Sequence, residues 1–390
     1  MEPDLKRARQ LVMEMLPIPG TSGQEGQIIA FLKKKLQQGG ASPNQIVVDD
    51  AHTRSELGGE IGNLVLKIPG AKGQPRRLLM AHVDTVPLCQ GCDPLWEGEF
   101  VRSANPATGL GADNRAGAAV LLSTALEILS SKRPHPPLTF LWPVQEEVGL
   151  YGSRHASLQA LGKPQLAFNW DGGTPTRVTV GATGAYRMRI HIDGLATHAG
   201  AAPEWGISAT AIASLAIAWL VREGWHGQIT KNGNQGTANV GYISGGKATN
   251  VVTDSVEVWA EARSHDPTFR RQILKAYKEA FEQAAQEVRN VSGARGKIHF
   301  KHRLDYESFK LDNNEPCVLA AERAIEGLGK EPERVVANGG LDANWLTERG
   351  IPTVTLGCGQ ESPHTVQERL NMPAFEEACR IALAIATEIE

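Results

Sequence analysis

The sequence predicts an α/β protein with an open, mostly parallel sheet, helices on both faces of that sheet, and a smaller α+β domain inserted into the chain. Two observations carry this prediction. Short apolar runs alternate with helix-like segments in the first and last parts of the chain, whereas the middle part consists of extended segments with two helical stretches among them. The length of 390 residues also exceeds what one ordinary core accommodates.

Four apolar runs are the expected strands of the main sheet. Each is short, bounded by turn residues and mostly without a polar face, which suits strands buried on both sides of a parallel sheet. The runs are RLLMAHV (77–83), LTFLWPV (138–144), LAFNW (166–170) and TVTLG (353–357). We expect helices at 114–131 and after Glu25, where Ser22 and Glu25 have capping-box spacing and a glycine pair ends the helical pattern.

The middle of the chain is expected to form the inserted domain. Its extended segments are AYRMRIHIDG (185–194), QGTANVGYISGG (235–246), SVEVWAEARSH (255–265) and GKIHFKHRL (296–304), with helical stretches at 207–221 and 267–290. Alternation of strands and helices resumes after about Phe309. We therefore predict a main domain of residues 1–182 and 309–390, interrupted by a domain of residues 183–308.

Composition excludes several classes of function. Forty basic and forty-three acidic residues give a net charge of −3, without the basic stripe that nucleic-acid binding needs. Residues 1–20 lack the continuous apolar region and the cleavage site of a secretory signal, and the weakly polar run 207–221 is too short to span a bilayer. Five cysteines without a signal indicate reduced thiols. We expect a cytoplasmic protein without nucleic-acid or membrane partners.

Cys89 and Cys92 form the single C-x-x-C motif of the chain. One such pair is at most half of a structural zinc site, and no matching pair follows at the spacing of a zinc finger. A packed pair of loop thiols is therefore favoured over structural metal or redox chemistry.

Titratable side chains gather at the ends of the predicted strands. In an open α/β sheet, ligands bind beyond the carboxyl ends of the strands, so polar residues there carry the most weight. They are His82 and Asp84 after the first run, Glu146 and Glu147 after the second, Asp171 after the third, His364 in a short loop after the fourth, and Asp113 directly before a helix. We expect them to share one rim of the sheet.

Imidazole and carboxylate groups together predict a metal site. Nitrogen and oxygen ligands suit zinc, cobalt or manganese, and they suit copper(I) or an iron–sulfur cluster poorly. One catalytic zinc takes three protein ligands, whereas this rim offers at least five candidates. The sequence therefore predicts two ions, about 3.5–4 Å apart, that share a carboxylate bridge.

The adjacent glutamates are expected to differ in role. Successive side chains of an extended backbone point to opposite sides, so Glu146 and Glu147 cannot easily both bind one pair of metals. One can ligate while the other faces substrate and transfers a proton from water to the leaving group. Asp84 is best placed to accept the second ring N–H of His82 and thereby to fix its tautomer.

The residues at these strand ends resemble, in order and spacing, the motifs of the dinuclear zinc hydrolases that include aminoacylase, glutamate carboxypeptidase and peptidase T. The motifs are HVDTVP, GLGADNRAG, QEEVG, NWDGG and PHT. The resemblance covers essentially the whole chain, because ATHAG, GGKATNVVTD, AEARS and NGGLDAN look like the peptidase T-like branch. The loop LCQGCDPLWEGEFVRSANPATG departs from the family pattern and leaves local substrate contacts open.

The resemblance implies a catalytic domain, formed by residues 1–182 and 309–390, and a lid domain that in relatives often mediates dimerisation. It implies that His82 and Asp171 hold one metal, that Glu147 and His364 hold the other, that Asp113 bridges the two, and that Glu146 is the general base. It also implies a cis peptide bond between Asp113 and Asn114.

The resemblance also implies roles for residues of the lid domain. His198 would help to stabilise the oxyanion, and Arg263 would bind a substrate carboxylate. Asn250 and the Gly339–Gly340 turn would line the same pocket.

Simpler interpretations compete with some of these roles. Asp113 stands where an aspartate commonly caps a helix, and His198 could serve only the turn before the next helix. Arg263 could pair with a nearby carboxylate such as Asp266 instead of substrate, and Asp342, at a predicted helix start, is better explained as a cap than as a catalyst.

The sequence and the resemblance together predict a cytoplasmic dinuclear zinc aminopeptidase that acts on tripeptides and forms a homodimer through its lid. Two Zn²⁺ ions are expected, with Co²⁺ or Mn²⁺ as substitutes. An N-acyl amino acid deacylase or a carboxypeptidase would use the same site. A metal-dependent peptide-binding protein without turnover is the alternative from another class. Dinucleotide binding at GLGADNRAG is disfavoured, because its glycine spacing does not match G-x-G-x-x-G.

Overall fold

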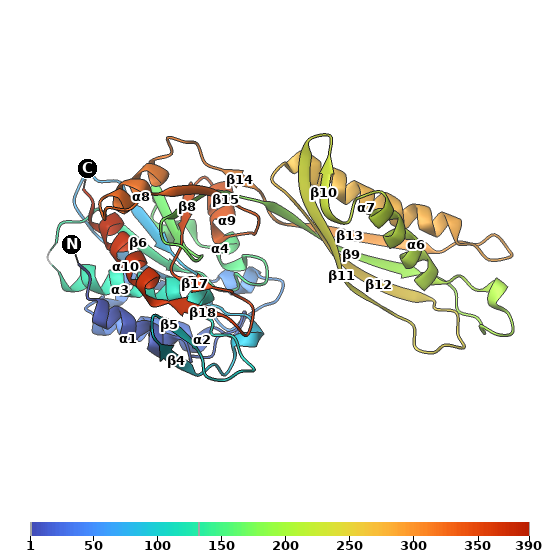
Figure 1. The fold of residues 1–390 in the computed structure, drawn as a ribbon, viewed down its shortest axis with the longest axis horizontal. Helices are drawn as coiled ribbons and strands as arrows, with labels where there is room; N and C mark the ends of the chain where they lie inside the picture. Colours follow the sequence, from blue (N-terminus) through green and yellow to red (C-terminus); the bar gives the residue numbers. More distant parts are fainter. Residues whose placement is uncertain (1, 132, 390) are drawn as a thin grey trace. The chain divides into compact units, whose positions relative to one another are not determined.

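The computed structural model describes residues 2–131 and 133–389. The chain divides into two compact units, which we name unit 1 (Met1–Ala182 with Lys310–Glu390) and unit 2 (Thr183–Phe309), both drawn in Figure 1. Within the described residues, no helix combines the length and the apolar character that crossing a membrane requires.

Unit 1 is built on a mixed sheet whose central strands are parallel (Figure 1). In spatial order its strands are β1 (Ile46–Val48), β2 (Leu64–Ile68), β6 (Leu138–Trp142), β3 (Arg77–Met80), β7 (Leu166–Trp170), β16 (Thr353–Leu356), β8 (Arg177–Ala182) and β14 (Phe309–Lys310), and β15 (Glu333–Ala337) pairs with β8. The pairs β6–β3, β3–β7 and β7–β16 are parallel, whereas β1–β2, β2–β6 and β16–β8 are antiparallel. The four apolar runs of the sequence are these central strands, so the predicted α/β architecture is confirmed.

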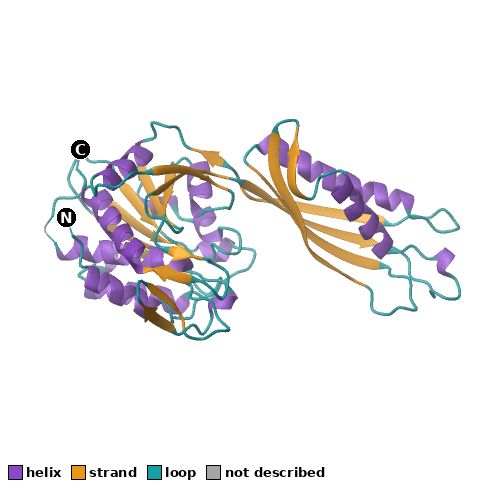
Figure 2. Ribbon diagram, in the orientation of Figure 1, coloured by secondary structure: helices purple, strands orange, loops and turns teal. Residues whose placement is uncertain are grey.

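Helices cover both faces of this sheet (Figure 2). One face carries α1 (Leu5–Met15), α2 (Gly26–Gln38), α3 (Ala112–Ser130), α8 (Pro316–Glu326) and α10 (Met372–Thr387), and the other carries α4 (Tyr151–His155), α5 (Leu158–Leu161) and α9 (Asp342–Glu348). Neighbouring residues of one strand face opposite layers. The Trp142 indole N–H donates to the Ala118 carbonyl of α3, whereas Leu141 packs with Leu161 and Leu346.

A smaller antiparallel sheet in unit 1 holds the loop that carries His364. Its strands are, in order, β17 (Gln360–Glu361), β18 (Arg369–Asn371), β5 (Phe100–Ser103) and β4 (Pro94–Glu97). His364 lies between β17 and β18, and its backbone is left-handed with a φ of 62°. The sheet therefore brings a residue from the last quarter of the chain to the edge formed by the central strands.

Unit 2 is an antiparallel sheet with helices packed on one face. The strands are, in spatial order, β10 (Gly227–Lys231), β11 (Asn234–Gly245), β12 (Ser255–Ser264), β9 (Gly184–Asp193) and β13 (Lys297–Tyr306), and the helices are α6 (Ala209–Arg222) and α7 (Pro267–Glu287). Ile190 and Val258 of the sheet share a core with Ile212 of α6 and Phe281 of α7. The extended and helical segments expected from the sequence are all present here.

The capping box expected at Ser22 and Glu25 is absent. α2 begins after Glu25, which makes no side-chain capping bond. The Ser22 hydroxyl donates instead to Oδ2 of Asp84 at 2.7 Å. The interpretation was wrong because a distant carboxylate, which the local spacing does not reveal, offers Ser22 a better partner than the start of the helix.

Asp113 is not a helix cap either. It lies within the span of α3, whose N-cap is Gly111, but the backbone of Asp113 and Asn114 is not helical. The peptide bond between these two residues is cis, as the resemblance implied.

Candidate metal centre

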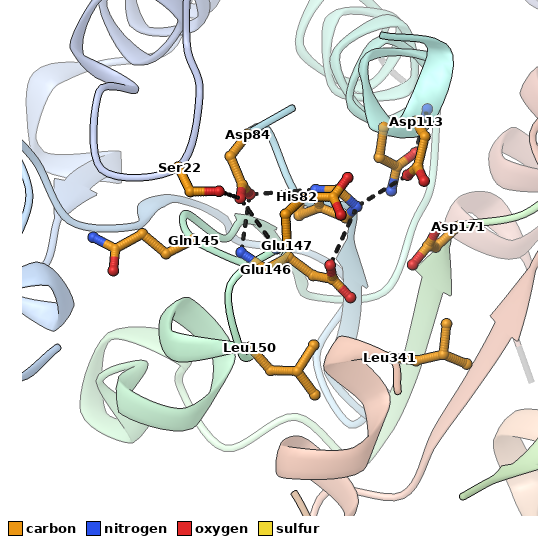
Figure 3. Close-up of polar contacts among 12 residues, drawn as sticks. Ser22, His82, Asp84, Asp113, Gln145, Glu146, Glu147, Leu150, Asp171 and Leu341 are labelled. Atoms are coloured by element: carbon orange, nitrogen blue, oxygen red, sulfur yellow. Dashed lines mark hydrogen bonds and ion pairs between the residues drawn. The ribbon is translucent and has the colours of Figure 1, made fainter. Parts of the chain in front are cut away.

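The first imidazole of the site is buried at the end of β3. The strand ends at Met80, and His82 follows with 1% of its surface exposed. Its Nδ1 lies 3.3 Å from Oδ1 of Asp84. Asp84 is fully buried and is held by the Ser22 hydroxyl (Figure 3). The carboxylate thus lies beside the ring nitrogen whose proton it would hold in a ligating histidine, although Nδ1 makes no well-directed hydrogen bond within the described residues.

Asp113 lies between the two histidines of the predicted site. Its Oδ1 is 3.3 Å from Nε2 of His82, and its Oδ2 is 3.3 Å from Nε2 of His364. The two oxygens of one carboxylate therefore face two different imidazoles. This is the orientation that a bridging ligand between two ions requires.

The candidate ligand atoms form groups that are compact enough to hold an ion. Within the described residues there are three such groups, and the ligand atoms of each lie within 4.8 Å of one another. The first group is His82, Asp113 and Asp171, the second is Asp113, Glu147 and His364, and the third is His82, Glu146 and Glu147. The first two groups share Asp113. They coincide with the two ligand sets that the resemblance implied.

The half of the site around His364 is more open than the half around His82. Oε2 of Glu147 lies 3.0 Å from Nε2 of His364, whose side chain is 52% exposed. Asp171 follows directly after β7, and its Oδ1 accepts a 3.0 Å hydrogen bond from Nε2 of Gln360. Segments after strand ends thus supply the more enclosed candidate ligands, and a loop supplies the exposed one.

Two buried carboxylates hold the backbone of the glutamate pair. Oδ1 and Oδ2 of Asp84 accept the N–H groups of Glu146 and Glu147 at 3.0 and 3.2 Å. Oε1 of Glu25 accepts the N–H of Gln145 at 3.0 Å. The N–H groups of residues 145, 146 and 147 therefore all have carboxylate acceptors. Figure 3 shows the contacts that converge on Asp84.

The backbone at the glutamate pair is not extended, because Gln145 has a left-handed φ of 56° and Glu147 lies in a turn. The expectation that Glu146 and Glu147 point to opposite sides was therefore wrong, since ligand atoms of both lie within 4.8 Å of each other and of His82.

The site contains more negative charge than its imidazoles neutralise. Burial raises the pKa of Glu147 to about 7, although a hydrogen bond from His364 opposes the shift. Burial and the charge of Asp113 raise the pKa of Asp171 to about 6. Hydrogen bonds to Asp113 and Glu147 raise the pKa of His364 to about 10. Each group therefore holds its proton to a higher pH than it would in water, because burial or neighbouring carboxylates disfavour the deprotonated form.

These residues fit a pair of divalent cations. Oδ1 of Asp113 is buried and accepts no well-directed hydrogen bond within the described residues. A buried carboxylate oxygen without such a partner is costly, and a cation beside it would supply both the partner and the missing positive charge. The nitrogen and oxygen donors suit zinc, cobalt or manganese.

Glu146 lies mostly enclosed beside the candidate ligand groups, with 10% of its side chain exposed. Its Oε2 lies 4.0 Å from Nε2 of His82, and burial raises its pKa well above the ordinary value. Asp342 contributes to this shift and is itself fully buried. It is the first residue of α9, whose N-cap is Leu341, so the interpretation of Asp342 as a cap is wrong. Its carboxyl belongs to the acidic surroundings of Glu146.

His198 and Asn250 lie close together within unit 2. The N–H of Ala199 donates to the Asn250 carbonyl at 2.9 Å. Nδ1 of His198 accepts the N–H groups of Gly200 and Ala201 at 3.1 Å each. The neutral ring therefore carries its proton on Nε2 and can donate a hydrogen bond from that atom.

Arg263 is paired within unit 2, although not with the partner weighed from the sequence. Its Nε and Nη2 donate to the two oxygens of Glu261 at 3.0 Å each. Asp266 instead accepts the N–H groups of Thr268 and Phe269 at the start of α7. The simpler interpretation, a pair between Arg263 and a nearby carboxylate, is therefore confirmed, but the partner is Glu261, because Asp266 caps a helix.

Unit 1 brings together the five predicted metal ligands, Glu146 and Asp84. Gly339 and Gly340 also belong to unit 1, where they form the bend before α9. His198, Asn250 and Arg263 belong to unit 2.

Comparison with known proteins identifies the family. Residues 78–388 match the profile of peptidase family M20/M25/M40. The chain belongs to this family. It is 30% identical over 388 residues to the uncharacterized protein YqjE of Bacillus subtilis, with 98% of each chain covered. A solved tripeptidase from Staphylococcus aureus is 29% identical with a TM-score of 0.88 and 99% coverage of both chains. The aminopeptidase PepT from Bacillus cereus is 30% identical with a TM-score of 0.82, covering 99% of this chain and 98% of its own.

The comparisons confirm the peptidase T-like resemblance, and the protein is a peptidase of the M20 family. In this M20 peptidase the two cysteines of the C-x-x-C motif are free and buried. Sγ of Cys89 lies 3.3 Å from Oε2 of Glu368, and Sγ of Cys92 lies 3.1 Å from the Leu16 carbonyl oxygen. Both contacts are those of packed thiols.

Sequence reasoning missed several residues of this M20 peptidase that contact the candidate ligands or the segments carrying them. They are Ser22, Glu25, Gln360 and Glu368. The capping-box interpretation concealed the first two. Gln360 and Glu368 lie four residues before and four residues after His364. Their closeness in sequence to a candidate ligand was the signal that could have identified them.

Proposed function

We propose that this M20 peptidase is a dinuclear metalloenzyme that releases the N-terminal residue of short peptides, with tripeptides as its main substrates. The observation that carries the proposal is the position of Asp113, whose oxygens face His82 and His364 at 3.3 Å each. The similarity to a tripeptidase and to the aminopeptidase PepT supports the substrate class.

Two zinc ions are proposed, with cobalt or manganese as substitutes. His82, Asp171 and Asp113 would hold one ion, and Glu147, His364 and Asp113 would hold the other. When bound, the pair polarises the scissile carbonyl and lowers the pKa of water from about 15.7 to about 7.

Glu146 is proposed as the general base. Its carboxylate takes a proton from the water whose oxygen attacks the carbonyl carbon, and it returns that proton to the amine nitrogen as the C–N bond breaks. Burial raises the pKa of Glu146, which suits a group that must both accept and release a proton near neutral pH. Asp84 holds the N–H of Glu146 at 3.0 Å, so the backbone of the base is oriented before substrate arrives.

Residues of unit 2 are proposed to recognise the substrate. The Nε2–H of His198 would donate to the oxygen that becomes negatively charged during attack. Arg263 would bind the terminal carboxylate of the peptide through the planar two-point geometry that it already uses on Glu261. Asn250 of unit 2 and, from unit 1, the Gly339–Gly340 turn would also contact the substrate.

The decisive experiment is Glu146→Gln. Glutamine preserves the shape of the side chain but cannot take the proton, so kcat on a tripeptide should fall by roughly 10²–10⁴ while both metals stay bound. Metal analysis and a tripeptide cleavage assay on the same preparation measure the two effects. Turnover near the wild-type rate would contradict the role of Glu146.

The substrate class is tested by assaying tripeptides, dipeptides and N-acyl amino acids side by side. Faster hydrolysis of acyl amino acids, or release of the C-terminal residue, would favour the related hydrolase activities over the aminopeptidase. Binding of a tripeptide without cleavage under saturating zinc would favour a peptide-binding protein.

We further propose a cytoplasmic homodimer that assembles through unit 2. Leu215 and Val221 of α6 are 41% and 56% exposed, and a second copy would cover them. All five cysteines are free and buried, which suits a reducing compartment. Light scattering should give a dimer for the wild type and a monomer for a variant carrying Leu215→Lys and Val221→Lys. A monomeric wild type would contradict this assembly.

A further inference from the structure

Glu368 joins the segment that carries Asp113 to the segment that carries His364. It lies four residues after His364 and directly before β18, with 1% of its surface exposed. Its Oε2 accepts the N–H groups of Leu110 and Gly111 at 2.9 and 2.8 Å, and its Oε1 accepts the N–H of Asp113 at 2.9 Å. One side chain therefore holds three N–H groups of the segment that ends at the proposed bridging ligand.

These N–H groups stand at the start of α3, where a helix offers its first N–H groups no partner of its own. The N-cap Gly111 makes no side-chain capping bond, and its φ is 79°. The backbone of Asp113 also departs from helical geometry. Glu368 replaces the missing cap from a distant part of the chain, and an ionised acceptor bonds N–H groups more strongly than a neutral one. The path of residues 110–113 therefore depends on Glu368.

Cys89 completes the surroundings of Glu368. Its Sγ lies 3.3 Å from Oε2 of Glu368, so this oxygen meets a thiol in addition to two N–H groups. The packing is tight, because a Cβ on Gly109 would come within 2.9 Å of Oε2 of Glu368 and 3.0 Å of Sγ of Cys89. The loop that departs from the family pattern thus acquires a role: it closes the pocket around the Glu368 carboxylate.

We propose that Glu368, enclosed by the Cys89 thiol, is a positioning residue that orients the Asp113 carboxylate between the two cations. The inference rests on the proposed function, since it requires Asp113 to bridge. Within the described residues, Glu368 is in none of the compact ligand groups and acts through Asp113. Because its own segment also carries His364, one short stretch supplies a ligand and orients the bridge.

The test compares Glu368→Gln and Glu368→Asp with the wild-type enzyme. Glutamine has one acceptor oxygen where the carboxylate has two, so at least one of the three N–H groups loses its acceptor. Aspartate keeps both oxygens on a shorter side chain and should recover part of the loss. For Glu368→Gln we expect a roughly 10–100-fold loss of metal affinity with a similar fall in kcat, while KM on a tripeptide changes little.

Two readouts besides activity report on the metals directly. Chelator competition gives the affinity of each cation, and the visible absorption of the cobalt-loaded protein reports its coordination geometry. Glu368→Gln should shift that spectrum. Cys89→Ala should give a smaller change in the same direction, and Cys89→Ser, which restores a donor to Oε2, should return the affinity toward the wild-type value.

Glu376→Ala is the matched control. It removes a partly buried glutamate of α10 that pairs with Arg9 and lies in none of the candidate ligand groups of the described residues. It should reduce thermal stability while leaving metal affinity, cobalt spectrum and kcat at wild-type values. The comparison separates loss of positioning from loss of stability.

The outcomes are distinguishable. A wild-type protein that binds two cations, together with a Glu368→Gln variant that keeps wild-type affinity, spectrum and kcat, would overturn the positioning role alone. Changes in Glu368→Gln no larger than those in Glu376→Ala would also overturn it. A wild-type protein that binds fewer than two cations would overturn the proposed function and the positioning role together.

Discussion

Unit 1 and unit 2 place their candidate functional residues in opposite electrostatic situations. In unit 1, burial raises the pKa of Glu147 to about 7 and that of Asp171 to about 6, and for Glu147 the hydrogen bond from His364 offsets only part of the shift. In unit 2, Arg263 is satisfied by a two-point pair with Glu261, and His198 is exposed and accepts two backbone N–H groups. Unsatisfied buried charge indicates a site completed by a resident cation, whereas satisfied groups near the surface suit reversible contact with substrate.

A similar contrast exists inside unit 1. His82 is buried at the end of a central strand, whereas His364 is exposed on a loop between short strands. Ligands on rigid elements are held more accurately than ligands on loops. The two histidines should therefore differ in how much the metal centre depends on them.

The largest effect is expected from His82→Ala. It removes a proposed ligand from a position that is 1% exposed and therefore closed to replacement by water, so metal affinity should fall by more than about 100-fold, beyond the range for residues outside the ligand set. His364→Ala should cost less, because water can enter its exposed position. Chelator competition with each variant measures both losses. If His364→Ala lost as much metal affinity as His82→Ala, or more, the expected difference between the ligand after a strand and the ligand on a loop would be contradicted.

His198→Ala should have the next largest effect and should act on turnover alone. Removing one donor to a developing oxyanion costs about 10²–10³ in kcat, and the metal affinity should stay at the wild-type value because no ligand of unit 1 is touched. His299→Ala, another exposed histidine of unit 2, is the control and should leave kcat unchanged. A loss of bound metal in His198→Ala would contradict the assignment of metal binding to unit 1 and of substrate contacts to unit 2.

Arg263→Ala should act on substrate affinity. We expect KM to rise by about tenfold for a tripeptide with a free carboxylate, which corresponds to about 1.4 kcal/mol, and to change little for the C-terminal amide. Kinetics with the matched pair of peptides measure the difference. An equal loss with both peptides would mean that Arg263 serves only its pair with Glu261.

The smallest effect concerns stability in the absence of metal. Glu147 and Asp171 have pKa values raised to about 7 and about 6, so the folded state keeps protons that the unfolded state releases from about pH 4 upward. His364, with a pKa of about 10, keeps a proton that the unfolded state loses above about pH 6.5. All three shifts make the metal-free protein less stable as pH rises.

Thermal unfolding of the chelated protein at about pH 5.5 and about pH 8 measures this dependence. The melting temperature should be several degrees lower at the higher pH, and saturation with zinc should remove the difference because the cations replace the bound protons. A chelated protein that is equally stable or more stable at the higher pH would contradict the surplus of buried negative charge.

The sequence was informative where a physical requirement acts on consecutive residues. Strands buried on both sides must be apolar throughout, so RLLMAHV and LAFNW were recognisable as β3 and β7. Because parallel strands end at one edge, the polar residues that follow them could be expected to meet there, and His82 and Asp171 do so, together with Asp113 from the start of α3. The capping box at Ser22 and the cap at Asp342 were wrong because local spacing cannot reveal a competing environment elsewhere in the fold.

The sequence by itself determined the order of strands and helices and the identities of the candidate ligands, since burial and strand ends impose regular local patterns. Only the tertiary structure decided which groups hold those ligands in place. Ser22 reaches Asp84 across 62 positions, Glu25 reaches Gln145 across 120, and Glu368 reaches Asp113 across 255. A hydrogen bond between such distant segments leaves no periodic trace in the chain, because it forms only after the folded backbone has brought donor and acceptor together.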